Sequence, residues 1–359
     1  MPAASHPEPS PLRRAIAALA DRRSLTESEA SEAFGVIMRG EATHSEIAAL
    51  LMGMRVKGET AEEVAGAARA LRQAMIPVDV EGASLVDTCG TGGGAISTFN
   101  ISTAAAFVAA GAGAAVAKHG NRSFTSKCGS ADVLEALGVA ISMDAAEAAR
   151  VLREACVTFL FAPNFHPAMK HAAPVRRELA VTSVMNLLGP LANPAGVRRQ
   201  VIGVADRERA PLVAAALARL GTEHALVVHG RVGMDEVSPF GVTDVWEVRA
   251  GGVSTWELDA ARYGLATGDV AALSGAEPSA NAARIERLLN DGGEDPVGNA
   301  ALVLNAGAAI YVAGLASSYA DGVERAQGTV RSGGGREALE RLRRATSTSG
   351  SRPRPRPAP

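Results

Sequence analysis

A short apolar run that breaks into glycine constrains this chain more than any other feature. Leu85–Cys89 is typical of a buried strand, four glycines stand among residues 90 to 94, and an alanine-rich helical pattern begins near Ile101. A loop without Cβ atoms lets the backbone approach a ligand closely, and the first N–H groups of the following helix lack partners within that helix. Together these features predict a cradle for a phosphate group.

The helix that follows the loop begins with polar side chains. Asn100, Ser102 and Thr103 cluster there, where they can hold a phosphate or a metal ion, although N-capping explains one of them equally well. The loop does not match the Walker pattern, since no Gly-Lys-Ser/Thr closes it. It also lacks the Gly-x-Gly-x-x-Gly spacing of dinucleotide-binding oxidoreductases, which disfavours that class.

Cations and carboxylates follow later predicted strands. Lys118, Arg122 and Lys127 fall within ten residues of one another at the end of the next strand, so the two loops could embrace a polyphosphate. Asp235 and Glu236 follow a further strand and a glycine-bearing turn, and adjacent carboxylates suit a Mg2+ ion that bridges to substrate phosphates. An isolated Asp-Glu pair is more often a solvated acidic turn, but its company with a phosphate loop favours the metal site.

The segment from residue 164 to 194 adds imidazoles, guanidinium groups and turns. Arg176 could bind a carboxylate through two parallel hydrogen bonds, although a lone Arg is usually a surface residue. His166 and His171 are each more often structural than catalytic. Asn186–Pro194 combines turn residues with apolar anchors and could line an aromatic pocket.

Short apolar runs alternate with helical patterns over roughly 240 residues after Pro77. The alternation predicts an α/β fold whose mostly parallel central sheet is flanked by helices. Ligands of such sheets bind at the carboxyl ends of strands, where the glycine loop falls. The predicted strands are Leu85–Cys89, Ala114–Ala117, Val157–Phe161, Val201–Ala205, Ala225–His229, Val245–Val248 and Val253–Glu257. The predicted helices are Ile101–Ala112, Ser130–Leu137, Asp144–Ala155, Arg209–Leu220, Ala280–Leu289 and Gly298–Ala313.

A small helical domain precedes this alternation. Its helix starts are three predicted capping boxes, Thr26 with Glu29, Thr43 with Glu46, and Thr60 with Glu63. Its apolar stripes are either core or a dimer face, and they comprise Phe34, Ile37, Met38, Ile47, Leu50, Leu51 and Met54. We assign residues 1–10 to a disordered N-terminus, 11–76 to the helical domain, completed by the short helices and turns of 166–194, 77–345 to the α/β domain, and 346–359 to a disordered Pro/Arg tail.

Composition excludes several classes of protein. A net charge of −2 argues against nucleic acid or an anionic membrane as the main partner. Cys89, Cys128 and Cys156 lack paired metal-ligand spacing, so a reducing cytoplasm is favoured over a disulfide framework. The first ten residues are polar and proline-bearing, unlike a signal peptide, and no uncharged apolar run approaches the ~20 residues that a membrane span needs. We expect a soluble cytoplasmic protein.

The order and separation of these motifs resemble the anthranilate phosphoribosyltransferase family over about residues 12 to 345. The resemblance implies a pentosyltransferase that makes N-(5-phosphoribosyl)anthranilate and pyrophosphate from anthranilate and phosphoribosyl pyrophosphate, in tryptophan biosynthesis. It also implies a Mg2+-dependent homodimer with a helical domain hinged to a larger α/β domain. The motifs that carry it are Gly90–Gly93, Thr98–Thr103, Lys118–Arg122, Gly129–Glu135, His166–Met169, Asn186–Pro190 and Asp235–Glu236.

The resemblance implies a role for each motif. We assign no obligatory general base, because an aromatic amine is already neutral at pH 7. Phosphoribosyl pyrophosphate would contact Gly90, Gly93, Gly94, Thr98, Asn100, Ile101, Ser102, Thr103, Lys118, His119, Gly120, Asn121, Arg122, Ser123, Phe124, Thr125, Ser126 and Ser130. Anthranilate would be held by Gly90, Asn121 and Arg176, with His119, His166 and Pro190 lining its approach. The Mg2+ ligands would be Ser102, Asp235 and Glu236.

One position departs from the family's pattern. Where the family commonly has Asp after Gly-Thr-Gly-Gly, this chain has Gly94, so a carboxylate near the pyrophosphate or its metal is missing.

Two other functions stay open. One is a nucleoside phosphorylase-like enzyme of related architecture, and the other is a non-enzymatic, nucleic-acid-binding paralogue, which would show a basic face and eroded metal residues. The intact Asp-Glu pair and the Gly-Asn-Arg loop favour the diphosphate substrate.

Overall fold

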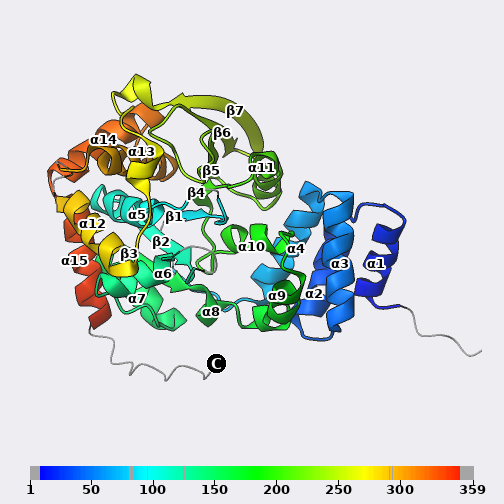
Figure 1. Ribbon diagram of the computed structural model, residues 1–359. Helices are drawn as coiled ribbons and strands as arrows, with labels where there is room; N and C mark the ends of the chain where they lie inside the picture. Colours follow the sequence, from blue (N-terminus) through cyan, green and yellow to red (C-terminus); the bar gives the residue numbers. More distant parts are fainter. Residues whose placement is uncertain are drawn as a thin grey trace, which may run out of the picture. The chain divides into compact units, whose positions relative to one another are not determined.

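The computed structural model describes residues 9–80, 82, 84–94, 96–123, 127–290, 292 and 294–347 (Figure 1). These residues form two compact units. The helical unit contains the described residues up to Met75 together with His166–Ala192, and the α/β unit contains Ile76–Phe165 together with the described residues from Asn193 onward. The chain therefore crosses from one unit to the other three times, and the first crossing lies beside the predicted boundary at residues 76 and 77.

The helical unit is a bundle in which α2 packs on α4, and α1 packs on both α2 and α3. The later segment adds short helices, of which α9 packs on α3 and α10 packs on α4. The elements are α1 (Pro11–Ala20), α2 (Glu27–Met38), α3 (His44–Lys57), α4 (Ala61–Ala74), the 3-10 helix η1 (Pro167–His171), α9 (Ala173–Leu179) and α10 (Met185–Leu191). A segment more than ninety residues further along the chain thus completes the bundle.

The three predicted capping boxes are confirmed at the starts of α2, α3 and α4. In each, the Thr hydroxyl accepts from the N3 backbone N–H and the Glu carboxylate accepts from the Thr backbone N–H. The apolar stripes are core, because every member is at most 4% exposed within the chain itself: Phe34, Ile37, Met38, Ile47, Leu50, Leu51 and Met54. The dimer-face interpretation of these residues was therefore wrong.

The α/β unit is built on one seven-stranded sheet with the order β3-β2-β1-β4-β5-β6-β7. Its strands are β1 (Leu85–Gly90), β2 (Ala115–Gly120), β3 (Val157–Phe161), β4 (Arg199–Gly203), β5 (His224–Gly230), β6 (Val242–Arg249) and β7 (Gly252–Asp259). The predicted mostly parallel sheet is confirmed, since the pairings β3–β2, β2–β1, β1–β4 and β4–β5 are all parallel. The last two pairings are antiparallel, because β6 follows β5, and β7 follows β6, without a crossover helix.

Helices cover the sheet on both faces. α5 packs on β1 and β2, α13 on β4, β1 and β5, and α7 on β3, whereas α11 packs on β5, β6 and β7. The helices of this unit are α5 (Ile101–Gly111), α6 (Ser130–Ala136), α7 (Ala145–Ala155), α8 (Ala162–Phe165), α11 (Ala210–Arg219), α12 (Pro278–Asn290), α13 (Pro296–Val312), α14 (Tyr319–Arg331) and α15 (Gly334–Ser347), with 3-10 helices η2 (Arg207–Arg209), η3 (Ala260–Tyr263) and η4 (Val270–Leu273). The nearly uninterrupted apolar faces of α5 and α13 fit their double burial, against the sheet and against outer helices.

Two helices of the C-terminal region were not predicted, since α14 and α15 follow Ala313 and pack against α13 and α5. The predicted start of the disordered tail, at Thr346, was wrong. Thr346 is the buried penultimate residue of α15, and its hydroxyl donates to the carbonyl of Leu342 at 2.9 Å. Ser347 ends α15, and the rest of the predicted tail, residues 348–359, lies outside the described residues, as do residues 1–8.

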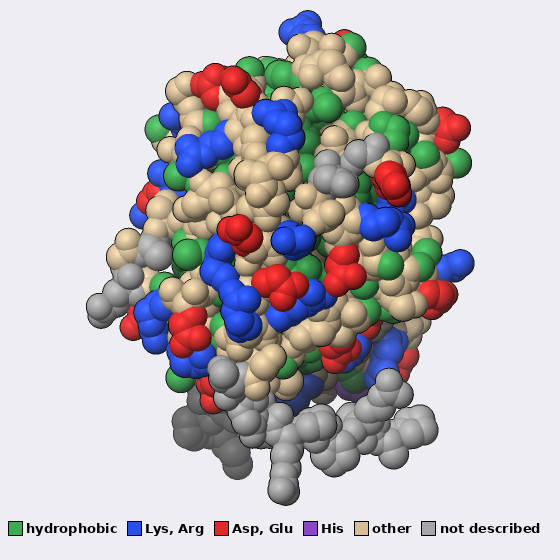
Figure 2. All heavy atoms as spheres, turned by 90° about the vertical axis from the view of Figure 1, so that its left-hand side faces the viewer, with side chains coloured by type: hydrophobic (Ala, Val, Ile, Leu, Met, Phe, Trp, Pro, Cys, Tyr) green, Lys and Arg blue, Asp and Glu red, His purple; other side chains and the backbone are tan. Residues whose placement is uncertain are grey.

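Figure 2 shows the side of the molecule on which α12, α14 and α15 lie, and basic and acidic side chains are interspersed there. These charges pair locally. Arg343 on α15 forms ion pairs with Glu286 of α12 and with Glu340, the latter at 2.6 Å. Among the helices that the structure describes, none has both the length and the apolar character to cross a bilayer.

Candidate active site

The glycine loop begins where β1 ends, between β2 and β4. Gly92 and Gly93 have φ angles of 65° and 78°, a left-handed conformation that favours glycine. Hydrogen bonds tie the loop to the end of β4: the Thr91 N–H donates to the carbonyl of Gly203 at 2.9 Å, and the Thr91 hydroxyl accepts from the Ala205 N–H at 3.2 Å. The loop is therefore held over the carboxyl edge of the sheet.

Asp235 packs directly against this loop. Its carboxylate accepts a hydrogen bond from the Gly92 N–H, and a Cβ on Gly90 would lie 3.0 Å from its Oδ2. At the end of β4, a Cβ on Gly203 would lie 1.7 Å from the Asp235 carbonyl oxygen, so only glycine fits there. Gly203 was not among the predicted site residues, although a glycine inside a predicted strand, here Val201–Ala205, is a signal of close backbone approach.

Lys118, Ser102 and Glu236 meet beside the loop. The Lys118 ammonium, at the end of β2, donates to the Thr88 carbonyl and to the Ser102 hydroxyl, the latter at 3.2 Å. The Ser102 N–H, in the first turn of α5, donates to Glu236 Oε1 at 3.3 Å. Three segments that are distant in sequence thus converge: the glycine loop with α5, the end of β2, and the Asp-Glu turn after β5.

At this point of convergence, the buried carboxyl groups of Asp235 and Glu236 both have raised pKa values. Burial raises the pKa of Asp235, and burial together with the charge of Asp235 raises the pKa of Glu236 to about 8. Burial lowers the pKa of Lys118, and the charge of Asp87 opposes that shift. Two adjacent carboxylates that resist ionisation are a donor set that a hard divalent cation would satisfy.

No group of three or more His, Cys, Asp or Glu side chains in the described part of the chain could hold a metal ion by itself. The Asp235–Glu236 pair could therefore supply only part of a coordination shell. Mg2+ usually keeps several waters and binds through one or two carboxylates together with substrate phosphates, which fits such a pair. The residues present are compatible with Mg2+ delivered with a diphosphate.

A buried polar anchor beneath the loop was missed by the sequence analysis. Asp87 on β1 is fully buried, and its carboxylate accepts from the His119 N–H at 3.2 Å and from the Asn193 side chain at 2.8 Å. Asn193 also donates to the Ala117 carbonyl at 2.8 Å. These bonds fix the end of β2 and the point where the chain re-enters the α/β unit. An aspartate inside an apolar strand is the signal that could have identified it.

Two predicted phosphate ligands already have protein partners. Asn100 does not cap α5 through its side chain, which instead donates to the Cys128 carbonyl and accepts from Asn281, both at 3.1 Å. Arg122 is paired with Asp132 and, through both terminal nitrogens, with Glu135. Both side chains have structural partners in this conformation.

The other predicted contacts of phosphoribosyl pyrophosphate lie along the same two loops. Ile101 and Thr103 are buried in α5, while Thr98 forms an isolated antiparallel β-bridge with Ser274. The Ser130 hydroxyl, at the start of α6, donates to the Asn121 carbonyl at 3.3 Å. The remaining described members are Gly120, which ends β2, and Ser123, whose N–H donates to Asp132. Phe124, Thr125 and Ser126 lie outside the described residues.

The predicted anthranilate residues are divided between the units. Gly90, His119 and Asn121 belong to the α/β unit, whereas His166, Arg176 and Pro190 belong to the helical unit. Arg176, on α9, is partly buried, and burial lowers its pKa. His166 is buried, which lowers its pKa to about 4, so its imidazole is neutral at pH 7. Pro190 is buried within α10.

Both parts of the chain match known families. The glycosyl transferase family, helical bundle domain, matches residues 13–75, and the glycosyl transferase family, a/b domain, matches residues 82–336. An anthranilate phosphoribosyltransferase of Rubrobacter xylanophilus is 50% identical over 336 residues, which cover 93% of this chain and 97% of the relative. The chain belongs to the anthranilate phosphoribosyltransferase family.

Solved structures of the family share the fold. The anthranilate phosphoribosyltransferase of Thermus thermophilus superimposes with a TM-score of 0.88 at 42% identity, over 93% of this chain and 99% of that one. The enzyme from Saccharomyces cerevisiae, in complex with phosphoribosyl pyrophosphate and Mg, gives a TM-score of 0.86 at 28% identity, over 94% and 98%. The fold predicted from the resemblance is therefore confirmed.

Gly94 stands where the resemblance described above leads us to expect an aspartate. A Cβ at Gly94 would lie 3.4 Å from Asp235 Oδ1 and 3.6 Å from the Gly233 carbonyl oxygen. An aspartate at this position would therefore place a further carboxylate beside Asp235.

Proposed function

We propose that this chain transfers the 5-phosphoribosyl group from phosphoribosyl pyrophosphate to the amine of anthranilate and releases pyrophosphate, as a step of tryptophan biosynthesis. The observation that carries the proposal is the convergence of the glycine loop, Lys118, Ser102, Asp235 and Glu236 at one edge of the sheet. The family membership, with high identity over nearly the whole chain, supports the same substrates.

The diphosphate end of the substrate is assigned to the loops of the α/β unit. We assign the phosphate oxygens to N–H groups of the glycine loop beyond Thr91 and Gly92, whose own N–H groups donate to Gly203 and Asp235, and Lys118 adds a buried positive charge. Pyrophosphate gains negative charge as it departs, so fixed donors here stabilise the transition state more than the ground state. A cation ~4 Å from the oxyanion attracts it by ~4 kcal/mol at an effective dielectric near 20, or roughly a thousandfold in rate.

Asp235, Glu236 and the Ser102 hydroxyl are the residues we assign to Mg2+. When bound, Mg2+ would offset the charge of the departing pyrophosphate. The two carboxylates must ionise to bind it, and the charge of a divalent cation would offset the cost of burial that raises their pKa values. The yeast relative was solved with phosphoribosyl pyrophosphate and Mg, which supports this assignment.

Anthranilate is assigned to Arg176, with Asn121 and Gly90 as further contacts. The Arg176 guanidinium can bind the carboxylate through two parallel hydrogen bonds. An aromatic amine is neutral at pH 7 and becomes acidic only as its bond to the anomeric carbon forms. We therefore assign no obligatory general base, and His166, which is neutral and buried, serves to line the approach.

The activity is tested by mixing the purified chain with Mg2+, phosphoribosyl pyrophosphate and anthranilate, and recording the loss of anthranilate fluorescence. The expected result is a loss that requires both Mg2+ and phosphoribosyl pyrophosphate, with one pyrophosphate released per anthranilate consumed. Asp235→Asn/Glu236→Gln should slow it by at least a hundredfold. Unchanged fluorescence, together with phosphorolysis of a nucleoside by inorganic phosphate, would replace this proposal with the phosphorylase.

We also propose that the chain is a cytoplasmic homodimer. Its three cysteines are free, which suits a reducing compartment. The homodimer is the assembly that the resemblance to the family implies. Light scattering at micromolar concentration should give twice the 36.7 kDa mass of the chain, and a monomer would contradict the dimer.

A further inference from the structure

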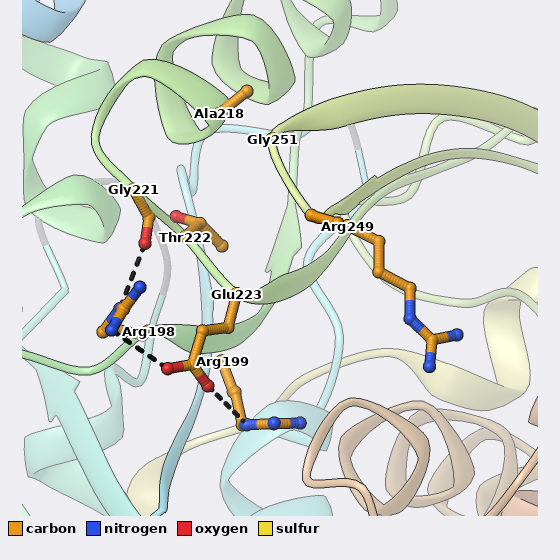
Figure 3. Close-up of a pocket in the computed structure, with 9 residues that line it drawn as sticks. Arg198, Arg199, Ala218, Gly221, Thr222, Glu223, Arg249 and Gly251 are labelled. Carbon is orange, nitrogen blue, oxygen red and sulfur yellow. Dashed lines mark hydrogen bonds and ion pairs between the residues drawn. The ribbon is translucent and has the colours of Figure 1, made fainter.

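A depression of about 460 Å3 lies at the edge of the sheet opposite the glycine loop. Arg198 and Arg199 line it at the start of β4, Thr222 and Glu223 at the start of β5, and Arg249 at the end of β6 (Figure 3). β6 runs antiparallel to β5, so its last residue lies beside the first residues of β4 and β5. The residues assigned to the diphosphate and to Mg2+ lie at the carboxyl ends of the strands, so this depression is a separate site.

Register brings the basic side chains to the same edge. Arg199 on β4 pairs with His224 on β5, and His224 pairs with Arg249 on β6. Residues in one such row project from the same face of the sheet. The two guanidinium groups therefore flank β5, with their Cα atoms two strand spacings apart, roughly 10 Å.

Two of the guanidinium groups are already oriented by the protein. Arg198 donates to the Gly221 carbonyl and pairs with Glu223, both at 3.1 Å. Arg199 pairs with the other oxygen of Glu223 at 3.1 Å and donates to the Val312 carbonyl at 2.8 Å. Figure 3 shows Glu223 between them and Arg249 on the other side of the depression. Such fixed side chains lose little conformational entropy when a ligand binds.

The depression has an excess of positive charge. Glu223 is its only lining carboxylate among the described residues, whereas three arginines line it. The nearest carboxylate in the pairing network, Glu247, is occupied by His224 at 2.8 Å and by the Tyr311 hydroxyl and the Trp256 indole at 2.9 Å. Within the described part of the chain, Arg249 makes one side-chain contact, a long one of 3.5 Å to that same tyrosine hydroxyl.

We propose that this depression binds a small anion that carries two phosphate or carboxylate groups. Arginine forks match both groups through parallel hydrogen bonds, and a ligand with two anionic ends can reach Arg198 or Arg199 with one end and Arg249 with the other. Net positive charge supplies the attraction. The site is independent of the proposed catalytic function, because no residue that lines it lies at the carboxyl edge of the sheet.

The test is a calorimetric titration of the full chain with inorganic pyrophosphate in EDTA, since EDTA removes the divalent ion that the proposed catalytic site requires. Arg198→Ala/Arg249→Ala should weaken binding at least tenfold. The matched control is Arg153→Ala/Arg331→Ala, two exposed arginines on α7 and α14 that change the net charge equally. The control should change the affinity less than twofold.

A variant that binds more tightly is a useful second test, because a folding defect would weaken binding and could not strengthen it. Glu223→Gln still accepts hydrogen bonds from the arginines but removes the competing negative charge, so it should tighten binding at least threefold. Arg249→Lys keeps the charge without the fork and should weaken binding severalfold. The proposal is overturned if the pocket double variant binds pyrophosphate as the wild type does, if the control loses as much affinity, or if Glu223→Gln binds no more tightly.

Discussion

Arg176 is a partly buried cation on α9 whose side chain forms no ion pair or hydrogen bond with any described residue. Burial lowers its pKa but leaves it charged at pH 7, so a ligand carboxylate would relieve an unmatched charge. Arg176→Ala should raise the KM for anthranilate more than tenfold with a smaller effect on phosphoribosyl pyrophosphate. Initial rates with each substrate varied in turn measure this. Equal damage to both KM values would remove the assignment, and Arg177→Ala, on the exposed side of α9, is the control.

Gly94 tests how many carboxylates the site needs. Since its Cβ position lies 3.4 Å from Asp235 Oδ1, Gly94→Asp would add a negative charge beside the carboxylate pair. We expect the Mg2+ concentration for half-maximal rate to fall at least threefold, because a divalent cation is attracted by the added charge. Gly94→Asn, of the same shape without the charge, should leave it unchanged. Identical Mg2+ curves for all three proteins would show that the departure from the family is neutral.

The sequence was enough to select many of the residues of the site, but not to predict which side chains they would bond to. Asp235, Glu236, Lys118 and Ser102 could be selected because charge and strand ends identify them before any contact is known. The partners of Asn100 and Arg122 could not, because Asn281 and Glu135 are brought to them by packing of α12 and α6. Gly203 was missed for the same reason, since the Asp235 backbone that excludes a side chain there is thirty-two positions away.

Glu63 shows how burial changes the energetic weight of one local motif. Its carboxylate caps α4, accepts from the Leu25 N–H at 2.9 Å and pairs with Lys57 at 3.0 Å, with no exposed surface. Glu46 caps α3 in the same way but remains partly exposed. Glu63→Ala should cost about 3 kcal/mol or more of unfolding free energy, because it leaves a buried ammonium unpaired, against about 1 kcal/mol for Glu46→Ala. Urea unfolding measures both, and equal costs would contradict the argument.

Glu247 gives the β5–β6–β7 region its own pH dependence. Hydrogen bonding from His224, Tyr311 and Trp256 lowers its pKa from 4.5 to about 2. A carboxyl whose pKa is lower in the folded state stabilises the fold above its unfolded pKa, and that stabilisation is lost as the pH falls from about 4.5 toward 2. Wild-type stability should therefore fall more steeply in this window than that of Glu247→Gln. Glu337→Gln, an exposed control on α15, should follow the wild type. Parallel curves for all three would refute it.

Elements with a strong local signal were predictable, and those defined by tertiary context were not. The capping boxes fix the starts of α2, α3 and α4 within the chain's own first turns, so sequence sufficed. The five strands that pair in parallel were found because buried parallel strands are continuous apolar runs. α14 and α15 are polar on their outer faces and bury only a stripe against α13 and α5, a weaker pattern. Thr346 was assigned to the tail because its Ser/Thr-rich surroundings outweighed that stripe.

At the scale of the molecule, the site is a consequence of strand order. Parallel pairing brings the ends of β1, β2, β4 and β5 to one edge, so loops separated by more than a hundred residues meet there. The opposite edge collects the residues that begin β4 and β5, which places the arginine depression away from the loops. The alternation of strands and helices predicted the first edge. The antiparallel return of β6, which brings Arg249 to the second, required the structure.

The most direct test of the central claim is a calorimetric titration of phosphoribosyl pyrophosphate at saturating Mg2+ into the wild type, Lys118→Met and Glu236→Gln. The account predicts that each substitution weakens binding at least tenfold, because the two residues belong to different segments but to one binding site. It also predicts that Arg153→Ala, at an exposed position of α7 outside both proposed sites, binds as the wild type does. Wild-type affinity in either Lys118→Met or Glu236→Gln would contradict it.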